Sequence, residues 1–298
     1  MDINFEYYKI FYYVAKYRNI TRAAAALGSS QPNVTRVMKL LEAQLNCRLF
    51  IRETRGISLT REGERLYSHV EVAYRHLVDA QEEIGRQELM KGGTVEIGAT
   101  ETALHLFLLK ALYAFRTDYP TIRIRIHNAA TPEIIRRLLD GRLDLAVITA
   151  PCEMPGAALY EKILDFREVL VGGNQYEALC RAPLKLKDVR KYPWVGLGRG
   201  SAAYEMYRNF FIEHKIDFEP DMEVATSDLM LPLIENNFGI GFVPKELAEP
   251  LLKEGRLVRI EIDASLPERS LQIVSDKRRG RSLAADTLYK FLQGEFST

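Results

Sequence analysis

The fold of this chain is decided near its beginning, at residues 21–45, which read TRAAAALGSSQPNVTRVMKLLEAQL. Thr21 is a good N-cap for a short helix of small residues, and Gly28 supplies the stop that ends it. Ser30 can cap a second helix, with Pro32 in its first turn. The stretch therefore predicts a helix, a tight turn and a second helix. Apolar residues recur along the inner face of the second helix at Val34, Met38, Leu41 and Leu45.

The second helix leaves polar side chains on its more exposed positions. Such donors and acceptors suit base edges and phosphates, which favours a nucleic acid as the partner. The alternative, that a given side chain only solvates the helix, stays open for each of them. They are Gln31, Asn33, Thr35, Arg36 and Lys39.

A short hairpin is predicted after this helix. Residues 49–52 (LFIR) and 57–60 (ISLT) read as two strands joined by the turn at 53–56 (ETRG). Arg52 and Arg55 lie at and beside the tip, which is the position of a wing that accompanies a helix-turn-helix.

The spacing of apolar residues changes after Arg61. Apolar residues alternate steps of four and three, and a sustained 3.5-residue repeat predicts a coiled-coil seam. An amphipathic helix packed on its own domain is the alternative, but the intervening positions are strongly polar and the segment ends in the joint Lys91-Gly92-Gly93. A dimerisation helix is therefore favoured. Its seam is Leu66, Val70, Ala73, Leu77, Ala80 and Ile84.

Charge is distributed unevenly along the 298 residues. Residues 1–60 hold nine Lys and Arg against four Asp and Glu, whereas the remainder holds 32 against 36. A basic module joined to a slightly acidic body indicates a polyanion partner at one end and another task at the other.

These motifs together resemble the winged helix-turn-helix of LysR-type transcriptional regulators. Two departures occur: Asn46 stands where the family usually has Gly, and Thr35 where it most often has Ser; both replacements keep the needed conformation or hydroxyl. By this resemblance Gln31, Pro32, Asn33 and Arg36 approach bases, Ser30, Thr35 and Lys39 serve the same interface, with Thr35 and Lys39 at phosphates, and Arg52 or Arg55 serves the wing. The match runs through Phe11-x-x-Val14-Ala15, Thr21-x-Ala23-Ala24-x-x-Leu27, Ser30-Gln31-Pro32-x-Val34-Thr35, Leu41-Glu42-x-x-Leu45, Leu49-Phe50-x-Arg52 and Leu59-Thr60-x-x-Gly63.

Beyond the joint, strands and helices alternate in doubly wound α/β order. Two lobes joined by crossings near residues 164 and 263 are expected, and this organisation resembles the periplasmic-binding-protein-like effector domain of the same family. The expected domains are a DNA-binding domain at 1–60, a linker helix at 61–90, and an effector domain at 91–298, with lobe I at 91–164 and 264–298 and lobe II at 165–263.

Hydroxyl-bearing residues stand at four junctions between strands and helices in this body. Open α/β sheets bind ligands outside the carboxyl ends of their strands, and helix N-termini favour anions, so a small anionic effector is expected. Ser and Thr are also ordinary N-caps, which is the alternative at each position. Glu101 opposes a simple anion pocket and indicates a ligand that also carries an amine or a hydroxyl. The candidate residues are Thr100, Glu101, Thr102, Thr131, Gly200, Ser201 and Thr226.

No enzyme or metal-site motif is present in the sequence. The motifs GxSxG, HExxH, GxxxxGK and GxGxxG are absent, and the three cysteines have no metal-ligand spacing. No cofactor is expected. The N-terminus carries charges where a signal peptide needs an apolar core, so a cytoplasmic protein without membrane contact is expected. The basic run at 277–281 (KRRGR) is interpreted as a solvated loop rather than a second nucleic-acid contact.

The sequence thus predicts a dimeric or tetrameric transcription regulator of bacterial type that binds double-stranded DNA and a small anionic effector, with RNA polymerase as a further candidate partner. A cytoplasmic solute-binding module without specific DNA readout is the alternative. A remnant enzyme would need catalytic groups in the cleft.

Overall fold

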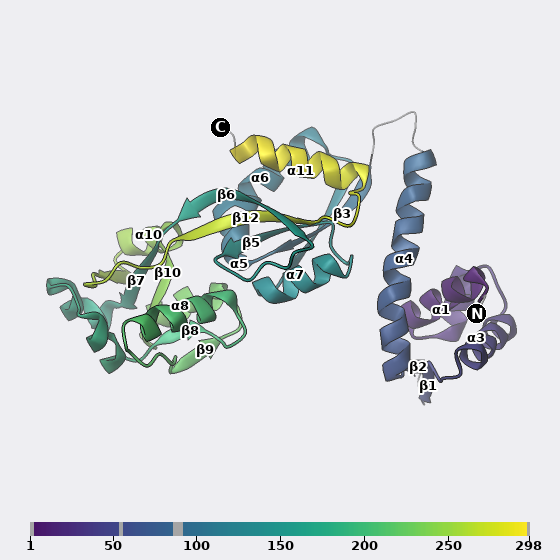
Figure 1. Cartoon of the computed structure of the whole chain (residues 1–298), viewed down its shortest axis with the longest axis horizontal. Coiled ribbons are helices and arrows are strands. Elements are labelled where there is room, and N and C mark those ends of the chain that lie inside the picture. Colours follow the sequence, from purple (N-terminus) through teal and green to yellow (C-terminus); the bar gives the residue numbers. More distant parts are fainter. Residues whose placement is uncertain (1–2, 54–55, 86–91, 297–298) are drawn as a thin grey trace. The chain divides into compact units, whose positions relative to one another are not determined.

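The computed structural model describes residues 3–53, 56–85 and 92–296 (Figure 1). Contacts within the chain separate two units, residues 1–88 and 89–298. Within the described ranges no helix is both long enough and apolar enough to cross a membrane.

The first unit is helical with one hairpin. Its core contains Phe11 and Leu41, both fully buried, and Val70 packs into the same core. The beginning of the long fourth helix therefore belongs to this unit. The elements are α1 (Phe5–Tyr17), α2 (Ile20–Ala26), α3 (Gln31–Leu45), β1 (Phe50–Glu53), β2 (Gly56–Leu59) and α4 (Arg61–Gly85).

The predicted caps of α3 are confirmed, and so is the stop of α2 at Gly28, whose φ is 60°, whereas the predicted N-cap of α2 is wrong. Ser30 accepts a hydrogen bond from the backbone N–H of Asn33, and Asn46 ends α3 with a φ of 51°. The N-cap of α2 is Asn19 rather than Thr21, because the Asn19 side chain accepts the N–H of Arg22. Asn and Thr both cap well, so the sequence did not separate these two positions.

Lobe I of the second unit is built on a five-stranded sheet in the order β4-β3-β5-β12-β6. The strands β4, β3 and β5 are parallel, whereas β12 runs antiparallel to both β5 and β6. Buried side chains of α6 and α11 cover one face of the sheet and those of α7 cover the other (Figure 1). Its elements are β3 (Gly93–Ala99), α5 (Glu101–Ala103), the π-helix η1 (Leu104–Leu108), α6 (Leu109–Asp118), β4 (Ile122–Asn128), α7 (Thr131–Leu139), β5 (Leu145–Ala150), β6 (Ala158–Phe166), β12 (Arg269–Asp276) and α11 (Leu283–Phe296).

Lobe II differs from the predicted parallel order. Its three-stranded sheet, β10-β7-β11, is antiparallel throughout. The pair β8-β9 is parallel, and a parallel bridge joins Trp194 to Ile240 at the start of β10. Helix α8 packs on one side and α9 and α10 on the other. Its elements are β7 (Glu168–Gly173), the 3-10 helices η2 (Asn174–Arg181), η3 (Leu186–Lys191) and η4 (Ser227–Leu229), β8 (Val195–Leu197), α8 (Ala202–Glu213), β9 (Met222–Val224), α9 (Met230–Glu235), β10 (Ile240–Pro244), α10 (Lys245–Lys253) and β11 (Leu257–Ile260).

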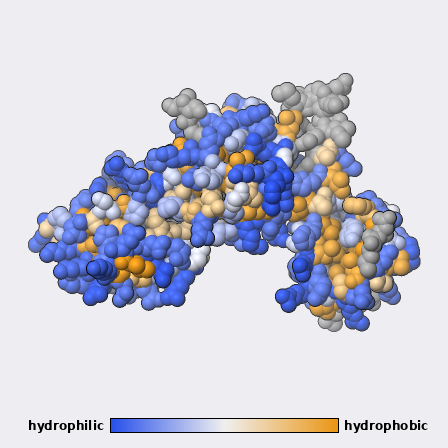
Figure 2. All heavy atoms as spheres, in the orientation of Figure 1, coloured by the Kyte–Doolittle hydropathy of each residue, from blue (hydrophilic) through white to orange (hydrophobic). Residues whose placement is uncertain are grey.

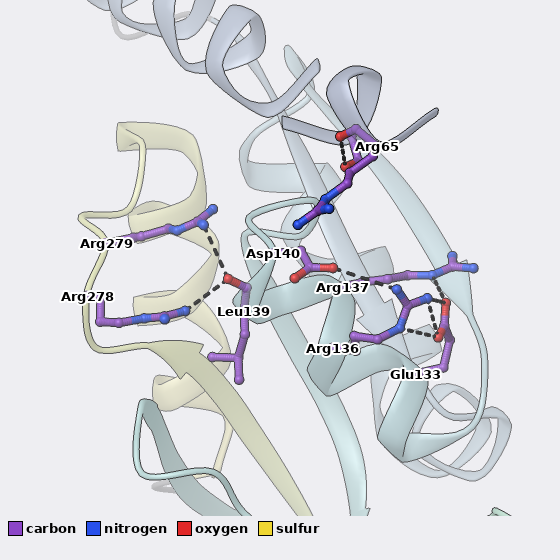
Figure 3. Close-up of polar contacts among 9 residues, drawn as sticks. Arg65, Glu133, Arg136, Arg137, Leu139, Asp140, Arg278 and Arg279 are labelled. Carbon is purple, nitrogen blue, oxygen red and sulfur yellow. Dashed lines mark hydrogen bonds and ion pairs between the residues drawn. The ribbon is translucent and has the colours of Figure 1, made fainter. Parts of the chain in front are cut away.

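Arginines of the basic run at 277–281 bind the end of α7. Arg278 and Arg279 both donate to the carbonyl of Leu139, at 2.9 and 3.2 Å (Figure 3). Arg278 also pairs with the buried carboxylate of Asp276 at 2.8 Å. Carbonyls at the C-terminus of a helix lack partners within the helix and carry partial negative charge, so these guanidinium groups stabilise α7. Most of the run is exposed, as expected for a solvated loop, and two of its arginines also hold the end of α7.

Candidate nucleic-acid interface and ligand cleft

Helix α3 presents the candidate polar face of the first unit. Val34, Val37, Met38 and Leu41 are buried on its inner side. The predicted DNA-binding residues of α3 are accessible, because the period of the helix places them on the side away from that core. Ser30, Gln31, Pro32, Arg36 and Lys39 are exposed, and Asn33 and Thr35 are half-buried.

Asn33 links the turn before α3 to the next turn of the helix. Its Nδ2 donates to Ser29 Oγ at 3.0 Å, and its Oδ1 accepts from Arg36 Nη2 at 3.1 Å. Arg36 is thus held by the residue one turn earlier, which lowers the rotamer entropy that it would lose on binding a ligand.

The predicted wing exists as a two-stranded antiparallel hairpin. Phe50 pairs with Leu59 and Glu53 pairs with Gly56. Glu42 of α3 joins the hairpin to the helix, since its Oε1 accepts the N–H groups of Leu49 at 2.7 Å and Phe50 at 3.2 Å. The side chain of Arg52 and all of Arg55 lie outside the described residues.

The predicted seam of α4 divides into two parts. Leu66 and Val70 pack into the core of the first unit, whereas Ala73, Leu77 and Ala80 are exposed. The side chain of Ile84 lies outside the described residues. A hollow between α1 and α4 is lined by apolar side chains, including Phe5, which is 75% exposed, and Leu77, which is 53% exposed. Figure 2 shows apolar residues on the visible surface of this unit.

The second unit contains a cavity of about 80 Å³ between its two lobes. The cavity brings together six of the seven candidate effector residues, from four separate junctions. Gly200 is not among the lining residues; its φ is 86° and it forms part of the turn before α8. The six are Thr100, Glu101, Thr102, Thr131, Ser201 and Thr226.

The hydroxyl groups that line the cavity make different contacts. Thr100 and Ser201 cap α5 and α8, accepting the N–H groups of Ala103 and Tyr204. Thr102 Oγ1 lies 3.4 Å from Ser227 Oγ and so joins the two lobes. Thr131 begins α7 without capping it, because the N-cap is Ala130, which offers no side-chain acceptor. Thr226 likewise makes no capping bond.

The carboxylate of Glu101 already has partners within lobe I. Its Oε1 lies 2.8 Å from His105 Nε2, and its Oε2 accepts from Asn128 Nδ2 at 2.8 Å. Glu101 therefore opposes an anionic ligand less than the sequence indicated, because its charge is engaged by neighbouring donors.

Two charged residues that the sequence analysis missed meet at the cavity. Arg269 Nη1 donates to Glu168 Oε1 at 2.5 Å, and the hydroxyl of Tyr207 donates to Glu168 Oε2. Both charged side chains are about 95% buried or more. Burial raises the pKa of Glu168, and the charge of Arg269 opposes that effect. Each lies at the start of an apolar strand, a local signal that does not reveal a pairing 101 residues apart.

Two family models match this sequence. The model described as bacterial regulatory helix-turn-helix protein, lysR family, matches residues 5–64. The model described as LysR substrate binding domain matches residues 90–297.

Similar relatives cover most of the chain. The uncharacterized HTH-type transcriptional regulator YeiE of Escherichia coli K12 is 25% identical over 95% of both chains. BbuR of Bordetella bronchiseptica is 25% identical over 89% of this chain and 80% of its own. GltR of Bacillus subtilis is 26% identical over 86% of this chain and 84% of its own.

Solved structures share the fold at lower identity. Full-length CbnR in complex with its target DNA has a TM-score of 0.69 and 22% identity, covering 98% of this chain and 99% of CbnR. A full-length OxyR variant from Pseudomonas aeruginosa has a TM-score of 0.68 and 15% identity, covering 99% of this chain and 95% of OxyR.

Proposed function

Because this chain belongs to the LysR family of DNA-binding transcriptional regulators, we propose that α3 reads an operator and that the cavity between the lobes binds a small, anionic effector. One observation carries the proposal: the predicted base-contacting residues share an accessible face of one capped helix, in a unit separate from the cavity. Reading and sensing are therefore assigned to different parts of the chain.

The proposed DNA interface uses α3 for the major groove and the hairpin for the neighbouring groove. Arg36 is the proposed base contact, with Gln31 and Asn33 beside it, while Lys39 and Thr35 serve phosphates. Two copies of the chain are proposed to pair along α4, because a single recognition helix reads few base pairs and a dimer reads two half-sites at a set spacing. RNA polymerase is proposed as a further partner at the promoter.

Fluorescence anisotropy on DNA from upstream of the gene tests DNA recognition. Specific regulation is expected to give a preference of about a thousandfold over scrambled DNA of equal length, with affinity falling steeply as salt rises. Equal, weak binding to upstream and scrambled DNA, and to genomic fragments selected on the protein, would instead favour a solute-binding module.

The effector role of the cavity is supported by the convergence of hydroxyl groups and the start of α7 on one cavity. Thr226→Val removes a hydroxyl that makes no capping bond, so the fold is expected to persist. The variant should lose its response to effector while it keeps its affinity for operator DNA. Loss of both properties would indicate damage to folding.

A further inference from the structure

We propose that Arg269 is the specificity-determining residue of the cavity and that it selects a ligand carrying a carboxylate or another small oxyanion. The inference rests on the proposed effector role of the cavity and deepens it. No sequence motif marks this residue, and its position in the fold supplies the argument.

The guanidinium of Arg269 has more hydrogen-bond donors than acceptors around it. A guanidinium has five N–H donors, and only Nη1 of Arg269 bonds to the protein among the described residues, through Glu168. The Nε is buried and has no hydrogen-bond partner there. The ring of Phe166 lies 5.1 Å from the guanidinium carbon and offers no acceptor atom. A buried donor without an acceptor is costly, so a ligand that offers an acceptor to this guanidinium gains free energy.

The location of Arg269 in the fold also favours this role. Glu168 is the first residue of β7 in lobe II, and Arg269 is the first residue of β12 in lobe I. The ion pair therefore lies at both crossings between the lobes and lines the cavity that separates them. A ligand held by Arg269 would contact the two segments that connect the lobes.

A second feature of the same cavity independently favours an anion. Ala130 and Thr131 line it at the beginning of the nine-residue helix α7, whose N-cap offers no side-chain acceptor. N–H groups in the first turn of a helix lack partners within the helix and carry partial positive charge. Pro132 has no N–H, and the N–H of Ile134 bonds to the carbonyl of Ala130. An oxyanion in the cavity can therefore accept from the N–H of Thr131, which lines it, and from Arg269.

Size narrows the class of ligand further. A cavity of about 150 Å³ holds benzene, and this cavity is about 80 Å³. In the described arrangement of the lobes its volume therefore matches an oxyanion of a few heavy atoms, and because the cavity is partly open to solvent, the rest of a larger acid can extend out of it. Acetate, oxalate and sulfate are suitable probes, and acetamide is a neutral control of nearly the same shape as acetate.

The full-length protein is titrated calorimetrically with these probes at constant ionic strength. The wild-type chain should bind at least one oxyanion and leave acetamide unbound. Glu168→Gln removes the carboxylate that competes for Arg269, so it should bind the same oxyanion about tenfold more tightly, the factor given by about 1.4 kcal/mol. The double variant E168Q/R269Q leaves no unpaired buried charge, and it should bind at least tenfold more weakly than wild type, since hydrogen bonds to charged groups are worth about 1.5–3 kcal/mol.

The opposite directions of these effects distinguish recognition from a structural role. If the ion pair only supported the fold, E168Q and E168Q/R269Q would change oxyanion affinity in the same direction. That outcome, unchanged affinity in the double variant, or no oxyanion binding by either wild type or E168Q, would overturn the proposal. Circular dichroism and operator affinity without ligand verify that each variant is folded.

The same proteins separate this inference from the proposed function. Oxyanion binding through Arg269 in a chain that binds all DNA equally would leave the inference standing and refute operator recognition. Specific DNA binding by a chain whose cavity does not bind oxyanions would support operator recognition and refute the inference about Arg269.

Discussion

At the scale of single residues, Arg36 is the side chain of α3 whose reach and charge suit a guanine edge. It is exposed, and Asn33 holds its Nη2 at 3.1 Å. Arg36→Ala should weaken operator binding by about 1–3 kcal/mol, because a good base contact contributes about that much. Fluorescence anisotropy with operator and scrambled DNA measures this loss of affinity. Arg208→Ala, at an exposed arginine of α8, is the matched control and should change neither affinity.

The contact between Asn33 and Arg36 permits a further test of that prediction. If Asn33 acts partly by positioning Arg36, Asn33→Ala and Arg36→Ala together should cost less affinity than the sum of the two single changes. Strictly additive losses would mean that each residue contacts DNA independently. Unchanged affinity in Arg36→Ala would remove this arginine from the interface.

Glu42 is the residue through which the recognition helix supports the wing. Glu42→Ala would leave the N–H groups of Leu49 and Phe50 without their acceptor, so it should lower the free energy of unfolding of the first unit by about 1–3 kcal/mol. Chemical denaturation followed by circular dichroism measures the loss. Glu42→Gln keeps a carbonyl oxygen and should retain most of the stability; equal losses in both variants would show that the negative charge matters instead.

At the scale of elements, a buried carboxylate joins β3 to the edge strand β4. Glu96 accepts from His127 Nε2 at 2.6 Å and Arg125 Nη1 at 2.8 Å. Burial opposes ionisation, but these hydrogen bonds outweigh it and hold the pKa of Glu96 below its ordinary value. A carboxylate with a lowered pKa contributes stability that is present above its unfolded pKa, about 4.3, and is lost as pH falls through the folded pKa.

Glu96→Gln should therefore destabilise the second unit by about 1–3 kcal/mol at pH 7, and this difference from wild type should shrink as pH falls from about 4.3 toward 3. Thermal unfolding of both proteins over that pH range measures it. A difference that stayed constant with pH would show that packing of the side chain, rather than its charge, stabilises the two strands.

The same scale shows which parts of the fold the sequence could predict. Ser30 and Asn46 bound α3 because caps act within a few residues, and the buried strands β3 and β5 read as apolar runs. Strand β6 carries little local signal, since most of its residues are exposed or half-buried without a regular alternation. The antiparallel pairing of β7 with β10 and β11 depends on how distant segments meet, which no local pattern records.

The residues of the candidate cavity could also be predicted only in part from the sequence. Its hydroxyl residues could be found because strand-to-helix junctions are visible in sequence and one edge of a sheet collects them. Glu168 and Arg269 could not be found, because each has a local alternative as a polar residue at a strand end. Only the return of β12 to the first lobe places them together.

At the scale of the whole molecule, the question is what covers the exposed half of the α4 seam. Leu77 is 53% exposed and lines the hollow beside α1, while Val70, seven residues earlier on the same seam, is buried in the first unit. The apolar seam of α4 is thus buried in the first unit along its N-terminal half and exposed along its C-terminal half. This pattern is expected if a second copy of the chain packs on the C-terminal half.

Leu77→Glu is therefore expected to convert the proposed dimer into a monomer, because it places a charge in the apolar seam without disturbing the core around Val70. Sedimentation velocity measures the mass, and circular dichroism should show unchanged helix content. Operator affinity should fall by far more than a single side-chain contact explains, since one recognition helix no longer tethers the other at the second half-site. Ile212→Glu is the matched control, because Ile212 is similarly exposed, at 52%, on α8 and should change neither mass nor DNA binding. A Leu77→Glu protein that stayed dimeric would place the pairing surface elsewhere, and a monomer that kept full operator affinity would separate dimerisation from recognition.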